Sequence, residues 1–271
     1  MNAIWIITVF HIIDDMMETL GHHSHVLAQV PDSEVLTVAV VSAKFFQNHH
    51  ERALGVLQAT GYLSGQLSTS RFNRRLHALA DWLPWLAEIL GETFATGEAF
   101  VIDSLPVPVC RRVRAWRCRK VRGRIYCGYC AAKNEKFFGW RLHLICTPQQ
   151  GEPVRFTVLP ASLHDLTPLH ELADALPEGA HLFGDKGYIS APDAVAILKA
   201  CGVRVIARPR DNMEELDWAD EFDLRLYRHG IETVNSQLEK MGLERLYART
   251  TPGFMLKVNA SMFALACSNF D

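Results

Sequence analysis

Apolar residues follow two different rhythms along the chain, and the change comes near residue 99. Before it, apolar positions recur with helical spacing in long segments that are separated by glycine-containing turns. This pattern predicts helices within residues 33–46, 49–63 and 71–90. After it, short apolar runs of strand length alternate with helical segments. We therefore expect a mostly helical region over residues 1–98 and an α/β domain over residues 99–271.

Five short apolar runs in the second region predict the strands of one sheet. They lie within residues 99–104, 139–147, 154–162, 181–184 and 203–210. A Pro-Gln-Gln-Gly-Glu-Pro turn joins the second and third, so these two should form an antiparallel hairpin. Helical segments follow the third, fourth and fifth strands. Asp165 is the expected N-cap of the first helix, and a polar pair with His164 that supports a nearby site is the alternative. This order is that of a ribonuclease-H-like fold, a mixed five-stranded sheet with helices.

The apolar run at residues 1–15 is too short to span a bilayer, and it has neither a basic leader nor a small-residue cleavage site. We expect it to form a buried helix or strand, in a cytoplasmic protein with no membrane contact. In that compartment the seven cysteines should be free thiols, because cytosolic reductants keep thiols reduced. The 49% hydrophobic content is enough for a substantial core.

The last helix of the N-terminal region is basic on one side. Ser70 is its predicted N-cap. A helix, a glycine-containing turn and a capped basic helix together outline a helix-turn-helix, a DNA-binding motif. An ordinary helical bundle with solvated arginines is the alternative. The arginines that would contact DNA are Arg71, Arg74 and Arg75.

Positive charge is otherwise concentrated between the first two strands. The net charge is −2, yet residues 101–150 contain 11 lysines and arginines against two acidic residues. We predict a basic, cysteine-rich insertion at residues 110–136. Arginines make bidentate contacts with phosphates and an indole stacks on bases, so the insertion should bind DNA; a solvated charge run is the alternative. The predicted contacts are Arg111, Arg112, Arg114, Trp116, Arg117, Arg119, Lys120, Arg122 and Arg124.

Three acidic residues lie where they can share one site. Asp103 ends the first predicted strand, Asp185 follows the fourth, and Glu232 lies in the C-terminal helical segment. The two strands are neighbours in a ribonuclease-H-like sheet, so the two aspartates should project side by side, with Glu232 closing the site from a helix. Carboxylates in this arrangement hold the two divalent ions of phosphoryl transfer, Mg²⁺ or Mn²⁺. Glu239 and Glu244 are the alternative helical acids.

Two basic residues accompany these acids. Lys186 follows Asp185 in a glycine-flanked turn and can approach a phosphate, although a plain turn is the alternative. Arg228 lies one helical turn before Glu232, so it can orient that carboxylate or hold a phosphate. A surface ion pair is the alternative for Arg228.

Four cysteines in the insertion raise the question of a structural zinc ion. Cys127 and Cys130 form one closely spaced pair, but Cys110 and Cys118 are separated by seven residues. A zinc ribbon usually has two close pairs. Free thiols are therefore favoured, with a zinc site as the alternative.

With these residues laid out, the chain resembles the DDE transposases of bacterial insertion sequences, and in particular the insertion-sequence 982 family. The resemblance covers residues 30–270 approximately and is most specific in Val-Ile-Asp-Ser-Leu-Pro-Val-Pro-Val-Cys and Gly-Asp-Lys-Gly-Tyr. It departs at the Tyr–Arg–Glu–Lys signature of related enzymes. The expected Tyr and Lys positions hold Arg225 and Glu239, with Tyr227 and Lys240 nearby.

The resemblance implies that Asp103, Asp185 and Glu232 form the DDE triad and depend on Mg²⁺ or Mn²⁺. It also implies that the protein nicks DNA at the ends of an insertion sequence and joins the 3′-hydroxyl to target DNA. The partners would be terminal inverted repeats and target DNA, and the protein would assemble on them as a homo-oligomer, a dimer, in the bacterial cytoplasm at the nucleoid. A DNA-binding regulator without catalysis and a phosphatase-like hydrolase with Asp103 as nucleophile are the alternatives.

Overall fold

The computed structural model describes residues 1–131, 133–209, 213 and 216–270. The chain divides into two compact units. The first contains Met1–Ile89 and Leu238–Asp271, and the second contains Leu90–Gln237. The first unit thus includes the C-terminal segment, whereas the sequence pattern predicted a single boundary at residue 98. The predicted domain assignment stays a prediction.

The first unit is helical. Its central helix is α2 (Asp32–Phe46), which packs against its neighbours α1, α3, α4 and α9 and has buried residues on every side. The apolar N-terminal run forms α1, which buries one face of five residues, as expected for a buried helix. No helix in the described part of the chain is long and apolar enough to cross a membrane. The surrounding elements are α1 (Ala3–Thr19), α3 (His50–Ala59), α4 (Thr69–Ala78), the start of α5 (Trp82–Phe94), η4 (Leu243–Arg245) and α9 (Thr251–Ala266).

Helix α4 begins two residues earlier than predicted. Its N-cap is Ser68, whose side chain accepts a hydrogen bond from the backbone N–H of Arg71, so the prediction of Ser70 was wrong. With Ser68 as the cap, Leu67 and Phe72 occupy the two positions of a hydrophobic staple, and both are buried. Burial of this apolar pair explains why the first of several neighbouring hydroxyl residues caps the helix.

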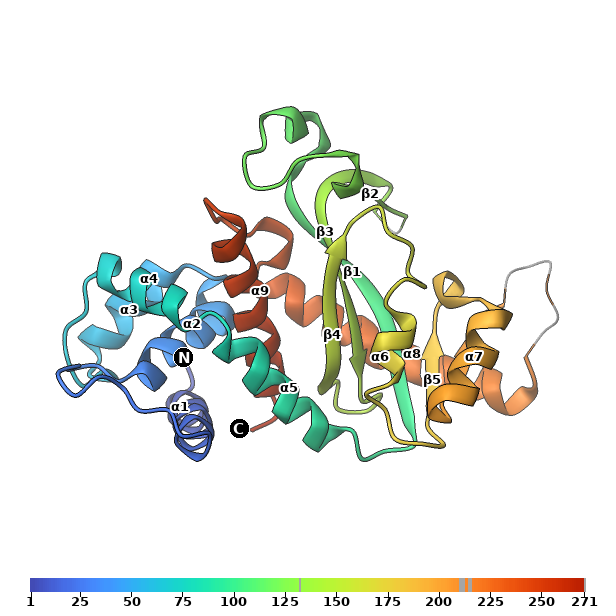
Figure 1. Ribbon diagram of the computed structural model, residues 1–271, viewed down its shortest axis with the longest axis horizontal. Helices are drawn as coiled ribbons and strands as arrows, with labels where there is room; N and C mark the ends of the chain where they lie inside the picture. The colour runs from blue at the N-terminus through green and yellow to red at the C-terminus, as the bar shows by residue number, and fades with distance from the viewer. Residues whose placement is uncertain (132, 210–212, 214–215, 271) are drawn as a thin grey trace. The chain divides into compact units, whose positions relative to one another are not determined.

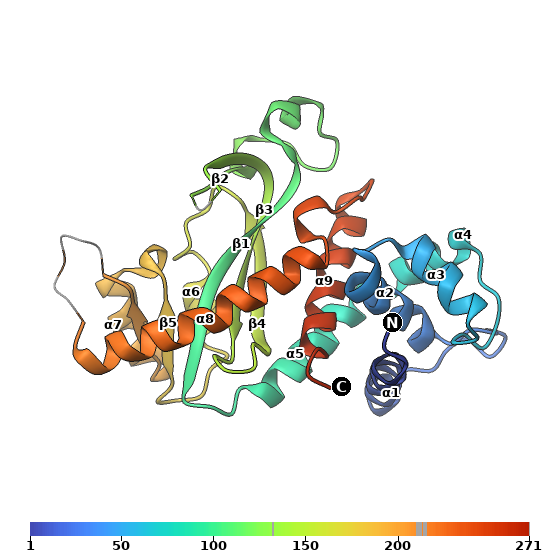
Figure 2. The same ribbon diagram turned by 180° about the vertical axis from the view of Figure 1, so that it is seen from behind.

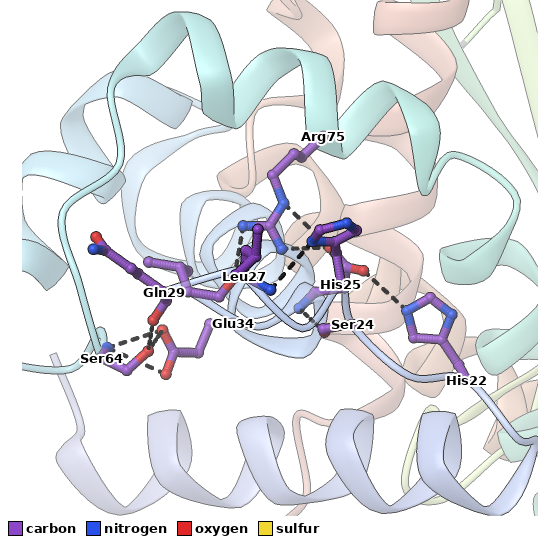
Figure 3. Close-up of polar contacts among 10 residues, drawn as sticks. His22, Ser24, His25, Leu27, Gln29, Glu34, Ser64 and Arg75 are labelled. Atoms are coloured by element: carbon purple, nitrogen blue, oxygen red, sulfur yellow. Dashed lines mark hydrogen bonds and ion pairs between the residues drawn. The ribbon is translucent and has the colours of Figure 1, made fainter.

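Arg75 of α4 is held inside the first unit by hydrogen bonds that Figure 3 shows. Its guanidinium donates to the Asp32 carboxylate and to the carbonyl oxygen of Val30. Asp32 also lies 3.0 Å from His22 Nε2, and its backbone N–H donates to Ser24. These contacts tie α4 to the start of α2.

A second carboxylate fixes the loop before α4. Glu34 is buried, 8% exposed, and accepts hydrogen bonds from the backbone N–H and the hydroxyl of Ser64. The same hydroxyl lies 2.8 Å from the carbonyl oxygen of Gln29, so its single hydrogen is shared between the two acceptors, as Figure 3 shows. The loop between α3 and α4 is therefore fastened to α2 by a satisfied buried carboxylate.

The second unit is built around one mixed sheet (Figure 1). Its strand order is β2-β3-β1-β5-β6. β4 also pairs with β3, on the side opposite β1 and along a later stretch of β3 than β2. All five predicted strands are present, as β1 (Ala99–Arg111), β3 (Glu135–Cys146), β4 (Pro153–Pro160), β5 (His181–Gly184) and β6 (Arg204–Ala207). The β3–β4 hairpin is antiparallel, as predicted, and β1, β5 and β6 run parallel.

Helices cover both faces of this sheet. The short α6 (Leu169–Ala173) and α7 (Ala191–Cys201) bury one face in a core that includes Ile102, Leu182 and Ile197. Helix α8 (Trp218–Lys240) crosses the other face, as Figure 2 shows. Successive residues of a strand point to opposite faces. Asp103 therefore points toward the α8 face, because Ile102 lies in the core under α6 and α7.

The basic insertion contains a sixth strand that the sequence pattern did not predict. β2 (Cys127–Cys130) pairs with the start of β3, where Cys127 lies opposite Phe138. Before it come two short 3₁₀ helices, η1 (Arg112–Arg117) and η2 (Arg124–Tyr126). The seven cysteines, all within the described residues, are free. A four-residue strand among glycine, tyrosine and cysteine gives too short an apolar run to be recognised from periodicity.

Asp165 does not cap a helix, so that prediction was wrong. Helix α6 begins at Leu169, and its N-cap position is Pro168. The residue before a proline is driven away from helical backbone angles, so Thr167 cannot continue a helix begun at Asp165. The segment instead forms a series of turns, in which the Thr167 N–H donates to the carbonyl of His164. Asp165 is thereby directed toward the end of the sheet.

Candidate active site

Asp103 and Asp185 lie on adjacent parallel strands, at the point where the pairing of these two strands ends. This end of the paired strands is called the sheet edge below. The last paired residues of β1 and β5 are Ile102 and Gly184, and each aspartate comes one residue later. Parallel pairing keeps the two chains in step. The predicted side-by-side placement of the two aspartates is therefore what the register produces.

The Asp103 carboxylate is held by two hydrogen bonds. Oδ1 accepts from the backbone N–H of Ser104 at 2.7 Å, and Oδ2 accepts from Asn235 Nδ2 of α8 at 2.7 Å. Burial raises the pKa of Asp103 to about 6, and the negative charges of Asp185 and Asp165 add to this rise, while the two hydrogen bonds oppose it. Asp103 is therefore a buried carboxylate with two negatively charged neighbours.

Asp185 is exposed and begins a single turn of 3₁₀ helix, η3 (Lys186–Tyr188). Its Oδ1 accepts a hydrogen bond from the Gly187 N–H at 2.8 Å. A Cβ atom on Gly187 would lie 2.9 Å from this oxygen and 2.7 Å from Oδ2 of Asp165. A side chain at position 187 would therefore displace one or both carboxylates, which accounts for the second glycine of the Gly-Asp-Lys-Gly-Tyr motif.

Asp165 is a third acidic residue at this sheet edge. Its Oδ1 lies 3.5 Å from Arg141 Nη1 and 3.9 Å from His143 Nδ1, both on β3. The sequence pattern favoured a cap because Asp165 precedes an apparent helix, and it left a polar His164–Asp165 pair that supports the site as the alternative.

Glu232 lies on α8 and is exposed. It comes three residues before Asn235, so the two share one side of the helix, and Asn235 contacts Asp103. Within the described residues, no three His, Cys, Asp or Glu side chains come close enough together to hold a metal ion. The triad of Asp103, Asp185 and Glu232 therefore stays a prediction.

The donors at the sheet edge nevertheless suit a hard divalent cation. Carboxylate oxygens are the ligands that Mg²⁺ and Mn²⁺ prefer. Burial is the largest cause of the raised pKa of Asp103, and the charges of Asp185 and Asp165 add to it, so bound positive charge would stabilise this cluster. The cluster fits metal chemistry in both ligand type and charge.

The basic insertion exposes most of its charge. Trp116 is 77% exposed, and the Arg117 guanidinium lies 4.3 Å from the centre of its ring. Val121, 6% exposed, anchors the loop. Lys120 is partly buried, and the exposed arginines are Arg111, Arg112, Arg114, Arg117, Arg119, Arg122 and Arg124.

The other predicted DNA contacts differ in their surroundings. Arg71 and Arg74 are exposed on α4, whereas Arg75 makes the internal hydrogen bonds described above. Lys186 is partly buried in η3. The side chain of Arg228 lies outside the described residues. The geometry thus favours a structural role for Arg75 over a contact with DNA.

Comparison with known proteins gives a family and a fold. A family model described as a transposase DDE domain matches residues 93–246. The cryo-EM structure of the piggyBac transposase synaptic complex with hairpin DNA aligns with 97% of this chain and 70% of that chain, at a TM-score of 0.51 and 12% identity. The Mos1 transposase paired-end complex with left transposon end aligns with 84% of this chain and 82% of that chain, at a TM-score of 0.25 and 13% identity. No curated protein matches the chain.

Proposed function

The chain belongs to the DDE transposase family, and from this premise we propose that it nicks DNA at the ends of an insertion sequence and joins the freed 3′-hydroxyl to target DNA. Membership makes it a metal-dependent, DNA-cleaving enzyme with a ribonuclease-H-like core. The observation that carries the finer proposal is the pairing of β1 with β5, which brings Asp103 and Asp185 to one edge. We also propose that the protein is a member of the insertion-sequence 982 family, that it comes from a bacterium, and that it assembles as a dimer on DNA.

Asp103 and Asp185, together with Glu232 from α8, would hold the metal ions. Two divalent cations at this edge would activate the attacking oxygen and stabilise the leaving oxygen. The protein's part is to fix the carboxylates. Asn235 orients Asp103, and the Gly187 N–H orients Asp185.

Two displacements at phosphorus make up the proposed reaction. In the first, a water oxygen bonds to the phosphorus at the element end, and the P–O3′ bond breaks to leave a 3′-hydroxyl and a 5′-phosphate. In the second, that 3′-hydroxyl bonds to a phosphorus of target DNA and expels a new 3′-hydroxyl. Both steps need a phosphodiester held in line with the attacking oxygen.

DNA contacts come from two surfaces in this proposal. The insertion offers seven exposed arginines and Trp116, a density of positive charge suited to phosphates with an indole for stacking. Helix α4 offers Arg71 and Arg74 as the second helix of a helix-turn-helix. Lys186, next to Asp185, would contact the phosphate near the reacting atoms.

Cleavage of a labelled duplex that carries the element end, with Mg²⁺ or Mn²⁺, tests the proposal. Wild-type protein should produce a nick at the end, and Asp103→Ala should lose it while binding the duplex normally. Asp174→Ala, at an exposed acid of the same unit, is the matched control. Retained nicking by purified Asp103→Ala would overturn the site. Binding by wild type without nicking at any metal concentration would favour a non-catalytic regulator.

A further inference from the structure

We propose that Asp165 is a positioning residue for the reaction, which holds the turn that carries Asp185 in place beside Asp103. This inference rests on the proposed function. Asp165 comes from the turn after β4, a segment separate from both strands that carry the aspartates. Its contacts involve the Asp185 turn, β3 and, through Arg141, the strand that carries Asp103.

The first set of contacts is with the Asp185 turn. Oδ2 of Asp165 lies 2.7 Å from the position that a Cβ atom would take on Gly187, and Oδ1 of Asp185 lies 2.9 Å from the same position. The two carboxylates therefore lie beside the same glycine, whose N–H holds the Asp185 side chain. A shift of Asp165 would leave space on this side of the turn.

The second set of contacts links Asp165 to the buried end of the turn through His143. Tyr188, the last residue of η3, is 1% exposed, and its hydroxyl lies 3.4 Å from Nδ1 of His143. The same nitrogen lies 3.9 Å from Asp165 Oδ1. His143 is fully buried, and burial lowers its pKa to about 4, so at neutral pH it is an uncharged hydrogen-bonding partner. Through His143, Asp165 is thus linked to Tyr188, the buried last residue of the turn.

The third set of contacts runs through Arg141. Its Nη1 lies 3.5 Å from Asp165 Oδ1 and 3.2 Å from the hydroxyl of Ser104, the residue after Asp103. Its Nη2 donates to the carbonyl oxygen of Tyr129 in β2. One guanidinium therefore joins the Asp165 turn, the strand of Asp103 and the base of the insertion. The negative charge of Asp165 attracts Arg141 to this junction.

Charge distinguishes a positioning role from simple packing. Two neighbouring carboxylates disfavour a third, because like charges repel, and the ion pair with Arg141 offsets part of that repulsion. An amide of the same shape would escape the repulsion but would lose the ion pair with Arg141. The arrangement becomes favourable once cations bind, so Asp165 should couple metal binding to the geometry of Asp185.

Asp165→Asn tests the inference, because the amide keeps the shape and removes the charge. Two readouts are measured in wild type, Asp165→Asn and the exposed-site control Asp174→Asn. One is the Mn²⁺-induced rise in Tm without DNA, and the other is the Mn²⁺ concentration that half-saturates nicking. We expect Asp165→Asn to show a smaller rise and a half-saturating concentration about 10-fold higher, with an unchanged KM for the duplex.

Gly187→Ala provides a second route, since its methyl group would collide with Asp165 and Asp185 while leaving the charge intact. It should shift the Mn²⁺ dependence in the same direction, and it keeps the inference testable if Asp165→Asn does not fold. An equal loss of Tm with and without Mn²⁺, together with an unchanged half-saturating concentration in both variants, would indicate a merely structural role and overturn the inference. If the wild-type protein does not nick DNA at all, the proposed function is wrong, and the inference fails with it.

Discussion

Nδ2 of Asn235 lies 2.7 Å from Oδ2 of Asp103, and this hydrogen bond joins helix α8 to strand β1 at the candidate active site. It fixes which side of α8 faces the carboxylates. Glu232 lies one turn earlier on the same side, and its place in the site stays a prediction. The relationship also makes Asn235 a test of how the site is tuned.

Asn235→Ala should weaken catalysis without preventing folding. The hydrogen bond from Asn235 opposes the rise in the pKa of Asp103, so its loss should raise that pKa further and weaken metal binding. We expect nicking at neutral pH to fall about 10-fold, with the acidic limb of the pH–rate profile moved to higher pH. The neighbouring exposed Ser236 supplies the control, Ser236→Ala. An unchanged profile in Asn235→Ala would remove Asn235 from the site.

Asp103→Asn should stabilise the metal-free protein while abolishing nicking. Folded Asp103 keeps its proton up to about pH 6, whereas its ordinary pKa is 3.8, so the folded state binds more protons between these values. The free energy of unfolding therefore decreases as pH rises from about 4 to 6 and stays reduced at pH 7. Urea unfolding should show Asp103→Asn more stable than wild type by up to about 3 kcal/mol at pH 7 and by much less at pH 4.5. Equal stability at both pH values would contradict this.

Arginine substitutions in the insertion should change the salt dependence of DNA binding. Replacing Arg112 and Arg117 with alanine should reduce the slope of log K against log salt by about 1 for each phosphate that the removed guanidinium groups neutralise. Trp116→Ala should instead weaken binding by about 1–3 kcal/mol with little change in slope, since stacking releases no counterions. Fluorescence anisotropy over a salt series measures both, with Lys199→Ala on α7 as the control. Identical slopes in the arginine variant and wild type would show that the insertion does not hold phosphates.

Two neighbouring arginines of α4 should behave differently. Arg75 donates to Asp32 and Val30, so Arg75→Ala should lower the free energy of unfolding by about 1–3 kcal/mol through the unpaired acceptors. Arg74 is exposed, so Arg74→Ala should leave Tm unchanged and weaken DNA binding. Thermal melts and gel shifts of the two variants separate these effects. A stable Arg75→Ala protein with weakened DNA binding would reverse the assignment.

His50 should make the first unit sensitive to acid. Burial lowers the pKa of His50 from 6.5 to about 3, and the positive charge of Lys257 and the nearby His77 and His49 add to this. The unfolded chain therefore binds more protons between these values, and stability falls as pH decreases below 6.5. The loss at pH 5 should be about 2 kcal/mol. His50→Leu should flatten the pH dependence of urea midpoints, whereas His23→Leu, at an exposed site, should not.

Local patterns in the sequence were sufficient for most elements of the second unit, β2 excepted. The strand-length apolar runs predicted β1 and β3 to β6, and residues of the usual capping types, Ser190 and Gly202, lie at the two ends of α7. The neighbouring positions of Asp103 and Asp185 also followed, because strand order determines which strand ends meet. These features depend on periodicity, capping and topology, which are all visible along the chain.

Tertiary contacts decided what local patterns left open. Ser68, Ser70 and Thr69 are all capping residues by type, and burial of Leu67 and Phe72 selected the first. Arg75 differs from Arg74 only because Asp32, far away in sequence, receives its guanidinium.

The site itself shows the same division. Two aspartates and a glycine-bounded turn were evident from the sequence, although β1 continues past Asp103 to Arg111. Asn235 was not assigned and Asp165 was expected first as a cap, because their roles depend on atoms brought together from a helix over one face and a turn after β4. A sequence can specify which groups are available, but distance and burial determine which of them meet, and those arise only when the sheet and its helices pack.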